Sequence, residues 1–227
     1  MDDAVRLGVD VGGTFTDVVL AVDGEVTTAK VPTTPGDQSA GVLEGIAAVG
    51  EAAGVDPGDV DSFRHAMTVA TNALLESEGA ETALVTTAGF ADVLEIGRQD
   101  RPALYDLDAE KPAPLVPADR RFEVRERATP DGVETPVDEA AVREVAEAIP
   151  ESVESVAVCL LHAYAHPENE RRAAETLAAT LDARVTASHE VLPTFREYER
   201  TATTAADAAV TPLIDSYVGT LAEAARN

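Results

Sequence analysis

Apolar and other residues alternate along the first part of the chain. Every second residue of 5–11 is apolar, the pattern stops at Gly12 and Gly13, and an apolar run resumes over 18–20. Alternation with a period of two is typical of a β-strand, and a glycine pair between two such runs is typical of a turn. We therefore expect a β-hairpin. The residues of 25–31 predict a third strand.

Further along, short apolar runs alternate with segments whose apolar residues recur at helical spacing. Thr33 to Gly36 is expected to end the third strand before a helix, and Arg98 to Val137 to form an excursion packed against the sheet. Helices are expected over 38–53, 73–78, 91–97 and along the apolar faces of 142–149 and 174–181, and strands over 63–67, 83–87, 121–127, 155–161 and 184–188. This alternation predicts an α/β fold with a mixed sheet flanked by helices.

A single apolar stripe occupies residues 210–221. Pro212 would begin or kink a helix there, so we expect one helix over 196–209 and another over 212–225. Such a stripe needs a packing partner, and nothing later in the chain can provide one.

Charge narrows the classes of partner. The chain has 227 residues, enough for one sizeable core or two small ones, and a formal net charge of −25. A strongly acidic surface is repelled by nucleic acids and by anionic membranes, so neither is an expected partner. It also indicates a halophilic source, where salt screens the self-repulsion. Disorder is not expected, because 45% of the residues are apolar and they fall in periodic blocks.

Cys159 is the single cysteine, so no disulfide can form within the chain. The acidic start and the absence of a long apolar stretch predict neither a signal peptide nor a transmembrane helix. We expect a cytoplasmic protein.

The glycine turn has the chemistry of a phosphate cradle. Gly12 and Gly13 allow positive φ and close approach of the backbone, and the hydroxyls of Thr14 and Thr16 add donors. Asp10 and Asp17 flank the turn. Carboxylates beside phosphates need a hard cation between them, which predicts Mg²⁺ held partly through water. The alternative is a tight glycine hairpin whose aspartates are simply solvated.

The order Asp-x-Gly-Gly-Thr-x-Thr-Asp over 10–17 resembles the first phosphate loop of the actin, hexokinase and Hsp70 superfamily. Together with residues 7–9 and 18–20 it resembles the start of the hydantoinase A / 5-oxoprolinase family. Three further blocks carry the same resemblance: 65–76, 86–107 and 189–201.

The resemblance implies an actin-like ATPase (ribonuclease H-like) lobe that uses ATP and Mg²⁺. It assigns catalytic roles to Asp10 and Asp17 and nucleotide contacts to Gly12, Gly13, Thr14, Thr16, Thr68, Thr71 and Asn72, with Asp10 holding Mg²⁺ through water. Thr16 and Asp17 are expected mainly to support the loop. Thr71 and Asn72 have an alternative role as helix caps.

Arg98, Gln99 and Arg101 are candidates for contact with an anionic substrate. The alternative is that they form ion pairs with the chain's many carboxylates. Arg196, Glu197, Glu199 and Arg200 are expected to form an interdomain charge network.

Family members are longer than this chain. The resemblance therefore implies an N-terminal lobe over 1–189 and the helical start of the central domain over 190–227, with the remaining domains or a partner subunit supplying the rest, in an expected oligomer. The implied activity is ATP-dependent hydrolysis of a cyclic amide through phosphorylation of its carbonyl oxygen. The alternatives are a subunit of an acetone or acetophenone carboxylase, a sugar or acyl kinase of the same superfamily, and a non-catalytic lobe that binds a partner.

Overall fold

Two four-stranded sheets, each with its own core, organise the chain in a computed structural model that describes residues 4–34, 38–100, 102–106 and 108–224. Met1–Glu78 and Leu213–Asn227 form one compact unit, and Gly79–Pro212 form the other. The expected single sheet is therefore two sheets, of which the first is mixed and the second is parallel.

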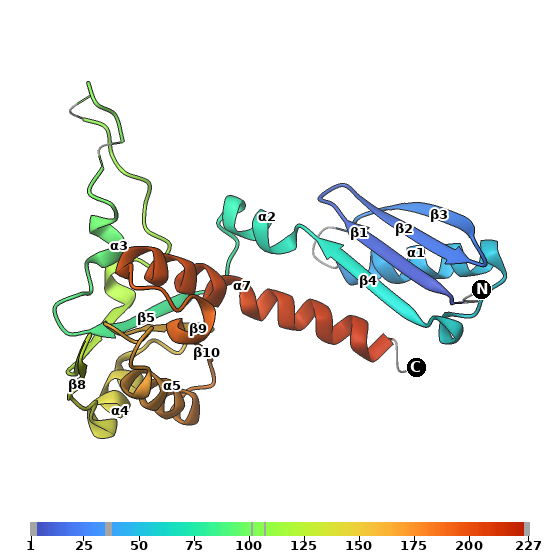
Figure 1. The fold of residues 1–227 in the computed structure, drawn as a ribbon. Helices are drawn as coiled ribbons and strands as arrows, with labels where there is room; N and C mark the ends of the chain where they lie inside the picture. The colour runs from blue at the N-terminus through green and yellow to red at the C-terminus, as the bar shows by residue number, and fades with distance from the viewer. Residues whose placement is uncertain (1–3, 35–37, 101, 107, 225–227) are drawn as a thin grey trace. The chain divides into compact units, whose positions relative to one another are not determined.

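The predicted hairpin and third strand are confirmed in the first unit. β1 (Arg6–Val11) and β2 (Phe15–Val22) are antiparallel, and β3 (Glu25–Pro32) continues the antiparallel sheet. β4 (Ser62–Met67) pairs with β1 in parallel, which makes the order β3-β2-β1-β4 (Figure 1). Alternate residues of β1 and β2 are buried, as the period of two in the sequence requires.

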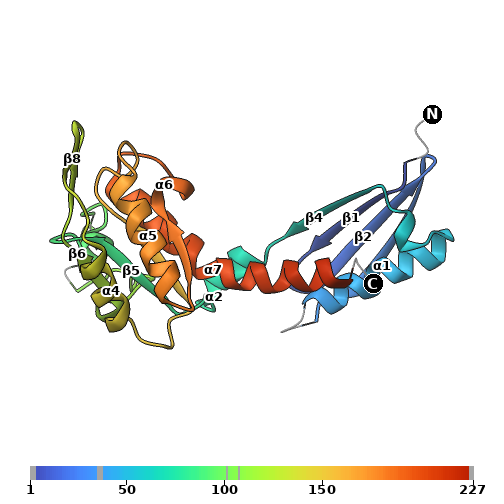
Figure 2. The ribbon, with the colours of Figure 1, turned by 90° about the horizontal axis from the view of Figure 1, so that it is seen from below.

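Helix α1 (Gln38–Ala53) covers one face of this sheet (Figure 2), and the short turn η1 (Pro57–Asp59) leads into β4. The helix packs closely because it carries Gly45, where a Cβ would lie 2.6 Å from a methyl group of Val18. The apolar cluster on this face contains the following buried residues: Leu7, Val9, Val11, Val18, Leu20, Val42, Val49 and Tyr217.

The second unit has a parallel sheet of order β10-β9-β5-β6. Its strands are β5 (Thr82–Thr87), β6 (Arg121–Val124), β9 (Ser155–Cys159) and β10 (Arg184–Ala187). Every residue of β5 and β9 is buried. Central strands of a parallel sheet are covered on both faces, which explains why β9 is largely apolar and why even the threonines of β5 are buried.

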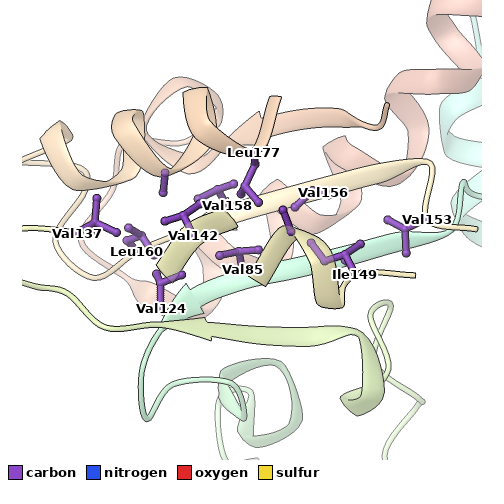
Figure 3. Close-up of a cluster of buried hydrophobic side chains, with 13 residues drawn as sticks. Val85, Val124, Val137, Val142, Ile149, Val153, Val156, Val158, Leu160 and Leu177 are labelled. Atoms are coloured by element: carbon purple, nitrogen blue, oxygen red, sulfur yellow. The ribbon is translucent and has the colours of Figure 1, made fainter. Parts of the chain in front are cut away.

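Helices α4 (Glu139–Ala148) and α5 (Glu168–Thr180) enclose a core with β5 and β9. Figure 3 shows Val85, Val156, Val158 and Leu177 meeting in this core. A separate cluster contains Leu84, Val116, Ala157, Cys159, Ala205 and Ala208.

The remaining elements are α2 (Val69–Glu76) in the first unit, and α3 (Val93–Ile96), η2 (Ala118–Arg120), the hairpin β7 (Arg127–Thr129) and β8 (Gly132–Thr135), and α6 (Ser188–Val191) in the second.

Several predicted boundaries were wrong. Helix α2 begins at Val69 rather than residue 73, because the chain turns into the helix as soon as β4 ends. The strand predicted over 121–127 is divided into β6 and β7. Most notably, the two predicted C-terminal helices are one helix, α7 (Glu197–Ala224), with Pro212 inside it.

The apolar stripe of α7 also has a partner within the chain. Tyr217 is 8% exposed and Leu221 packs against the same cluster of the first unit. Leu213 and Val218 remain more exposed, at 37% and 47%. The expectation that the stripe is left without a partner is therefore wrong, because the residues that cover it come earlier in the sequence. Among the described residues, no helix combines the length and hydropathy needed to cross a membrane.

Candidate phosphate site

The turn between β1 and β2 is a tight loop over Gly12–Thr14. The N–H of Gly12 donates to the carbonyl oxygen of Phe15 at 3.0 Å, and a Cβ on Gly12 would lie 3.2 Å from that oxygen. Neither Gly12 nor Gly13 has a positive φ. The glycine at position 12 is therefore explained by close approach of the backbone, and not by the positive φ that a glycine turn was expected to use.

Thr33 links the loop to the end of β3. Its hydroxyl donates to the carbonyl oxygen of Gly12 at 2.9 Å, and its backbone N–H donates to the carbonyl oxygen of Thr14 at 3.0 Å. The hydroxyl of Thr16 lies 3.2 Å from the hydroxyl of Thr33. Because the Thr33 hydroxyl already donates to Gly12, Thr16 is the donor of this pair. Thr16 is fully buried, which favours the supporting role expected for it. Thr14 is exposed.

The N-terminus of α2 lies against this loop. Thr68 donates from both its N–H and its hydroxyl to the carbonyl oxygen of Val11, at 3.2 and 3.3 Å. The amide nitrogen of Asn72 lies 3.4 Å from the Thr68 hydroxyl and 3.6 Å from where a Cβ on Gly13 would be. The first N–H groups of a helix have no partner within it, so they can serve an anion.

Thr71 and Asn72 do not cap α2, because both lie inside the helix that begins at Val69. Thr68 occupies the cap position, and its side chain makes no capping hydrogen bond. The structure thus brings Thr68 and Asn72 to the loop, and it moves Thr71 and Asn72 from the cap into the first turn of α2.

The two predicted carboxylates face each other across the hairpin. Asp10 and Asp17 are paired in the register of β1 and β2. Asp10 is exposed, and its carboxylate has no hydrogen-bond or ion-pair partner among the residues that the structure describes. Asp17 is held by Lys30, whose ammonium lies 2.7 and 2.8 Å from its two oxygens. The sequence pattern gave Lys30 no role.

His65, the first residue of the block over 65–76, lies on β4 beside β1. Its Nε2 is 2.8 Å from the hydroxyl of Tyr217, and its ring stacks on those of Tyr217 and Phe63. Burial lowers the pKa of His65, against an opposing effect of Asp10, and burial raises the pKa of Tyr217 to about 12. Both shifts favour a neutral pair in which the tyrosine hydroxyl donates to Nε2. This pair attaches the C-terminal part of α7 to the sheet of the first unit.

The candidate substrate residues lie in the second unit. Arg98 donates to Glu199 at 2.8 Å, and that hydrogen bond raises the pKa of Arg98. Arg98 therefore forms an ion pair of the kind expected as the alternative to a substrate contact, and it also lines a pocket of about 380 Å³ with Leu94 and Tyr198. Gln99 has a φ of 59°, in the left-handed region. Arg101 falls outside the described residues.

Arg200 was expected in an interdomain charge network, and the structure shows it buried, with neutral hydrogen-bond partners. It is 1% exposed and donates to the carbonyl oxygens of Leu160 and Thr194 and to the hydroxyl of Ser188. Ser188 in turn donates to the buried carboxylate of Glu170. Glu170 also accepts from the backbone N–H groups of Leu160 and His189. A buried arginine satisfied in this way holds the start of α7 within the second unit.

A further hydrogen bond joins the Nδ1 of His189 to Glu170 at 2.8 Å. This bond raises the pKa of His189. The block over 189–201 therefore has a clear structural role in the second unit.

The residues of the loop fit a nucleotide phosphate with its cation. Within the described part of the chain, the N–H groups of Gly13 and Thr14 have no acceptor, and Asp10 offers an oxygen of the kind that Mg²⁺ prefers. No group of three or more histidine, cysteine or acidic side chains in that part could hold a metal ion by itself. Any Mg²⁺ here would thus depend on phosphate oxygens and water, as expected for Mg²⁺ bound with nucleotides.

The α/β fold, with a mixed sheet that begins with a glycine-turn hairpin, is that of an actin-like ATPase lobe. The family described as the hydantoinase/oxoprolinase N-terminal region matches residues 6–181. The chain belongs to this family.

Three curated relatives illustrate the range of the family. The caprolactamase subunit alpha of Pseudomonas jessenii is 37% identical over 94% of this chain and 32% of its own length. The acetophenone carboxylase gamma subunit of Aromatoleum aromaticum is 36% identical over 91% of this chain and 31% of its own length. The 5-oxoprolinase of Saccharomyces cerevisiae is 30% identical over 96% of this chain and 20% of its own length.

Solved structures agree with this assignment. The ATP-dependent caprolactamase from Pseudomonas jessenii has a TM-score of 0.84 and 35% identity over 97% of this chain and 33% of that chain. A nucleotide-free acetone carboxylase has a TM-score of 0.86 over 98% of this chain and 34% of that chain; at 24% identity it shows the fold alone. The chain spans between 20% and 34% of the length of these proteins.

Proposed function

We propose that this chain is the phosphate-binding lobe of an ATP-dependent enzyme that hydrolyses a cyclic amide. The observation that carries the proposal is the Gly12–Thr14 loop, which Thr33 holds in shape and which lies against the N-terminus of α2. Relatives with this region include a 5-oxoprolinase and an ATP-dependent caprolactamase, which supports a cyclic amide as the substrate class.

Different residues at the loop would bind the phosphates and the cation. Gly13 and Thr14 supply donors to the phosphates, while Gly12 permits the close turn because its own N–H already bonds Phe15. Asp10 holds the cation through water, and the exposed Thr71 and the amide of Asn72 extend the donor set along α2. The N–H groups of the first turn of α2 add to the attraction for an anion.

Mg-ATP would supply a γ-phosphoryl group to the amide oxygen as the bond from that group to ADP breaks. One water would then add to the activated carbon, and the C–N bond would break as the nitrogen takes up a proton. A second water would release phosphate and leave the free carboxylate of the opened ring. In this reaction, the residues of this chain position the phosphates and balance their charge. The acceptor site is assigned to the remainder of the protein, together with Arg98, Gln99 and Arg101. We also propose that residues 1–189 form the N-terminal lobe and that residues 190–227 form the start of the central domain.

A second candidate is a subunit of an ATP-dependent ketone carboxylase, favoured by the likeness to the acetophenone carboxylase gamma subunit. The two candidates share the phosphate site and differ in the acceptor. Supplying 5-oxoproline or caprolactam, and separately acetophenone with bicarbonate, to the full protein distinguishes them by which one stimulates release of phosphate.

The direct test is calorimetric titration with Mg-ATP in molar KCl. We expect saturable binding that weakens at least ten-fold in Asp10→Asn, because the cation loses its carboxylate. Glu25→Gln is the matched control, since it removes one exposed carboxylate from the far end of the same sheet and should bind like the parent. If Asp10→Asn binds Mg-ATP as tightly as the unsubstituted protein, Asp10 does not hold the cation. If the unsubstituted protein is folded and binds no Mg-ATP, the proposed phosphate site is wrong.

A further inference from the structure

Three charged side chains form a row across the first sheet. Asp10 on β1 is opposite Asp17 on β2, and Asp17 is opposite Lys30 on β3. Their neighbours Val11 and Val18 are buried toward α1, so by the alternation of a strand the row lies on the other face of the sheet. All three residues are exposed.

Asp10 and Asp17 repel each other, and Lys30 reduces this repulsion. Like charges directly opposite each other on a sheet are destabilising, and Asp10 and Asp17 are such a pair. Lys30 binds both oxygens of Asp17, and its ammonium lies 5.2 Å from the centre of the Phe15 ring. Asp17 thereby has a cationic partner, while the side chain of Asp10 has none among the described residues.

We propose that Lys30 is a positioning residue of the phosphate site, which pairs with Asp17 so that Asp10, of the two carboxylates in this row, is the one left to attract a cation. The inference rests on the proposed function. A lone carboxylate attracts a hydrated cation that arrives with a nucleotide. Two free carboxylates would bind the cation alone more tightly and would repel the phosphates when no cation is present.

The test compares binding of ATP in EDTA with binding of Mn²⁺ alone, in the full protein and at the lowest KCl concentration that keeps it folded. We expect Lys30→Met to weaken metal-free ATP binding about five-fold and to strengthen Mn²⁺ binding by a similar factor, as one added charge near the site would do. Both effects should shrink as KCl is raised, because salt screens exposed charges.

The double variant Lys30→Met, Asp17→Asn separates charge balance from structure. It removes both members of the pair, so it should move ATP and Mn²⁺ binding from the Lys30→Met values back toward those of the parent. Lys30→Arg should also retain them. Lys111→Met is the matched control, because Lys111 donates to the carbonyl oxygen of Ile96 in the second unit and should change neither affinity.

The outcomes distinguish this inference from the proposed function. A parent protein that binds no nucleotide overturns the proposed function, and the inference with it. A parent that binds nucleotide, with Lys30→Met equal to it in both assays, overturns the role of Lys30 alone. Loss of ATP binding that Asp17→Asn does not restore also overturns the inference, because Lys30 would then contact phosphate directly or act only through packing.

Discussion

At the scale of single residues, Thr33 links parts of the candidate site that lie far apart in the sequence. Its hydroxyl donates to Gly12, its N–H donates to Thr14, and its hydroxyl oxygen accepts a hydrogen bond from Thr16. The sequence pattern indicates Thr33 only as the end of a strand. No local signal shows that a residue 21 positions away holds the glycine loop, because that contact depends on the return of the chain through β2 and β3.

Thr33→Val tests this link, since valine keeps the shape of the side chain and removes its hydroxyl. We expect a loss of about 1–3 kcal/mol in the free energy of unfolding, because the buried hydroxyl of Thr16 is left without its acceptor. Affinity for Mg-ATP should fall as the loop loosens. Urea titration and calorimetry measure the two effects.

The exposed neighbour Thr34 provides the control. Thr34→Val should change the free energy of unfolding by less than about 0.5 kcal/mol. Parent-like stability of Thr33→Val would show that the Gly12 and Thr16 hydrogen bonds do not support the loop.

At the scale of elements, α7 is the least expected feature. Proline has no N–H to donate to the carbonyl oxygen of Ala208 four residues earlier, which is why two helices were predicted. Burial on both sides of Pro212 stabilises one continuous helix instead: Ala205 and Ala208 lie in one cluster, and Tyr217 lies in another. Propensity is thus overridden by tertiary packing.

Pro212→Ala should therefore stabilise the protein by about 1–3 kcal/mol, because alanine restores the helical donor and has high helix propensity. Urea unfolding followed by circular dichroism measures the change. Pro57→Ala is the control: Pro57 occupies the first position of η1, where the missing N–H costs little, so the loss should be below about 1 kcal/mol. A Pro212→Ala variant no more stable than the parent would mean that the helix already compensates for the missing bond.

At the scale of the whole molecule, the chain divides into two units with separate cores, and its surface carries a net charge of −25. Each core is small enough to depend strongly on the balance between apolar burial and charge repulsion. This balance, rather than any single ion pair, is expected to set the response to salt, since the pairs that involve Arg98 and Lys30 are largely exposed.

We expect the melting temperature to rise as KCl is increased from about 0.05 to 0.5 M and then to level off, because the Debye length falls to a few ångströms over that range. Thermal denaturation followed by circular dichroism checks this, and sucrose serves as a control that acts without screening. A melting temperature that ignores salt below 0.5 M would show that charge repulsion does not limit the stability of this chain.

Most strands and helices, and the glycine turn between β1 and β2, could be predicted from the sequence, because strand alternation, helical spacing and a glycine pair depend only on residues near one another along the chain. Only the tertiary structure decided the division into two sheets, the loop contact of Thr33, the pairing of Lys30 with Asp17 and that of His65 with Tyr217. Those features depend on which segments the folded chain brings together, and no short-range pattern encodes that.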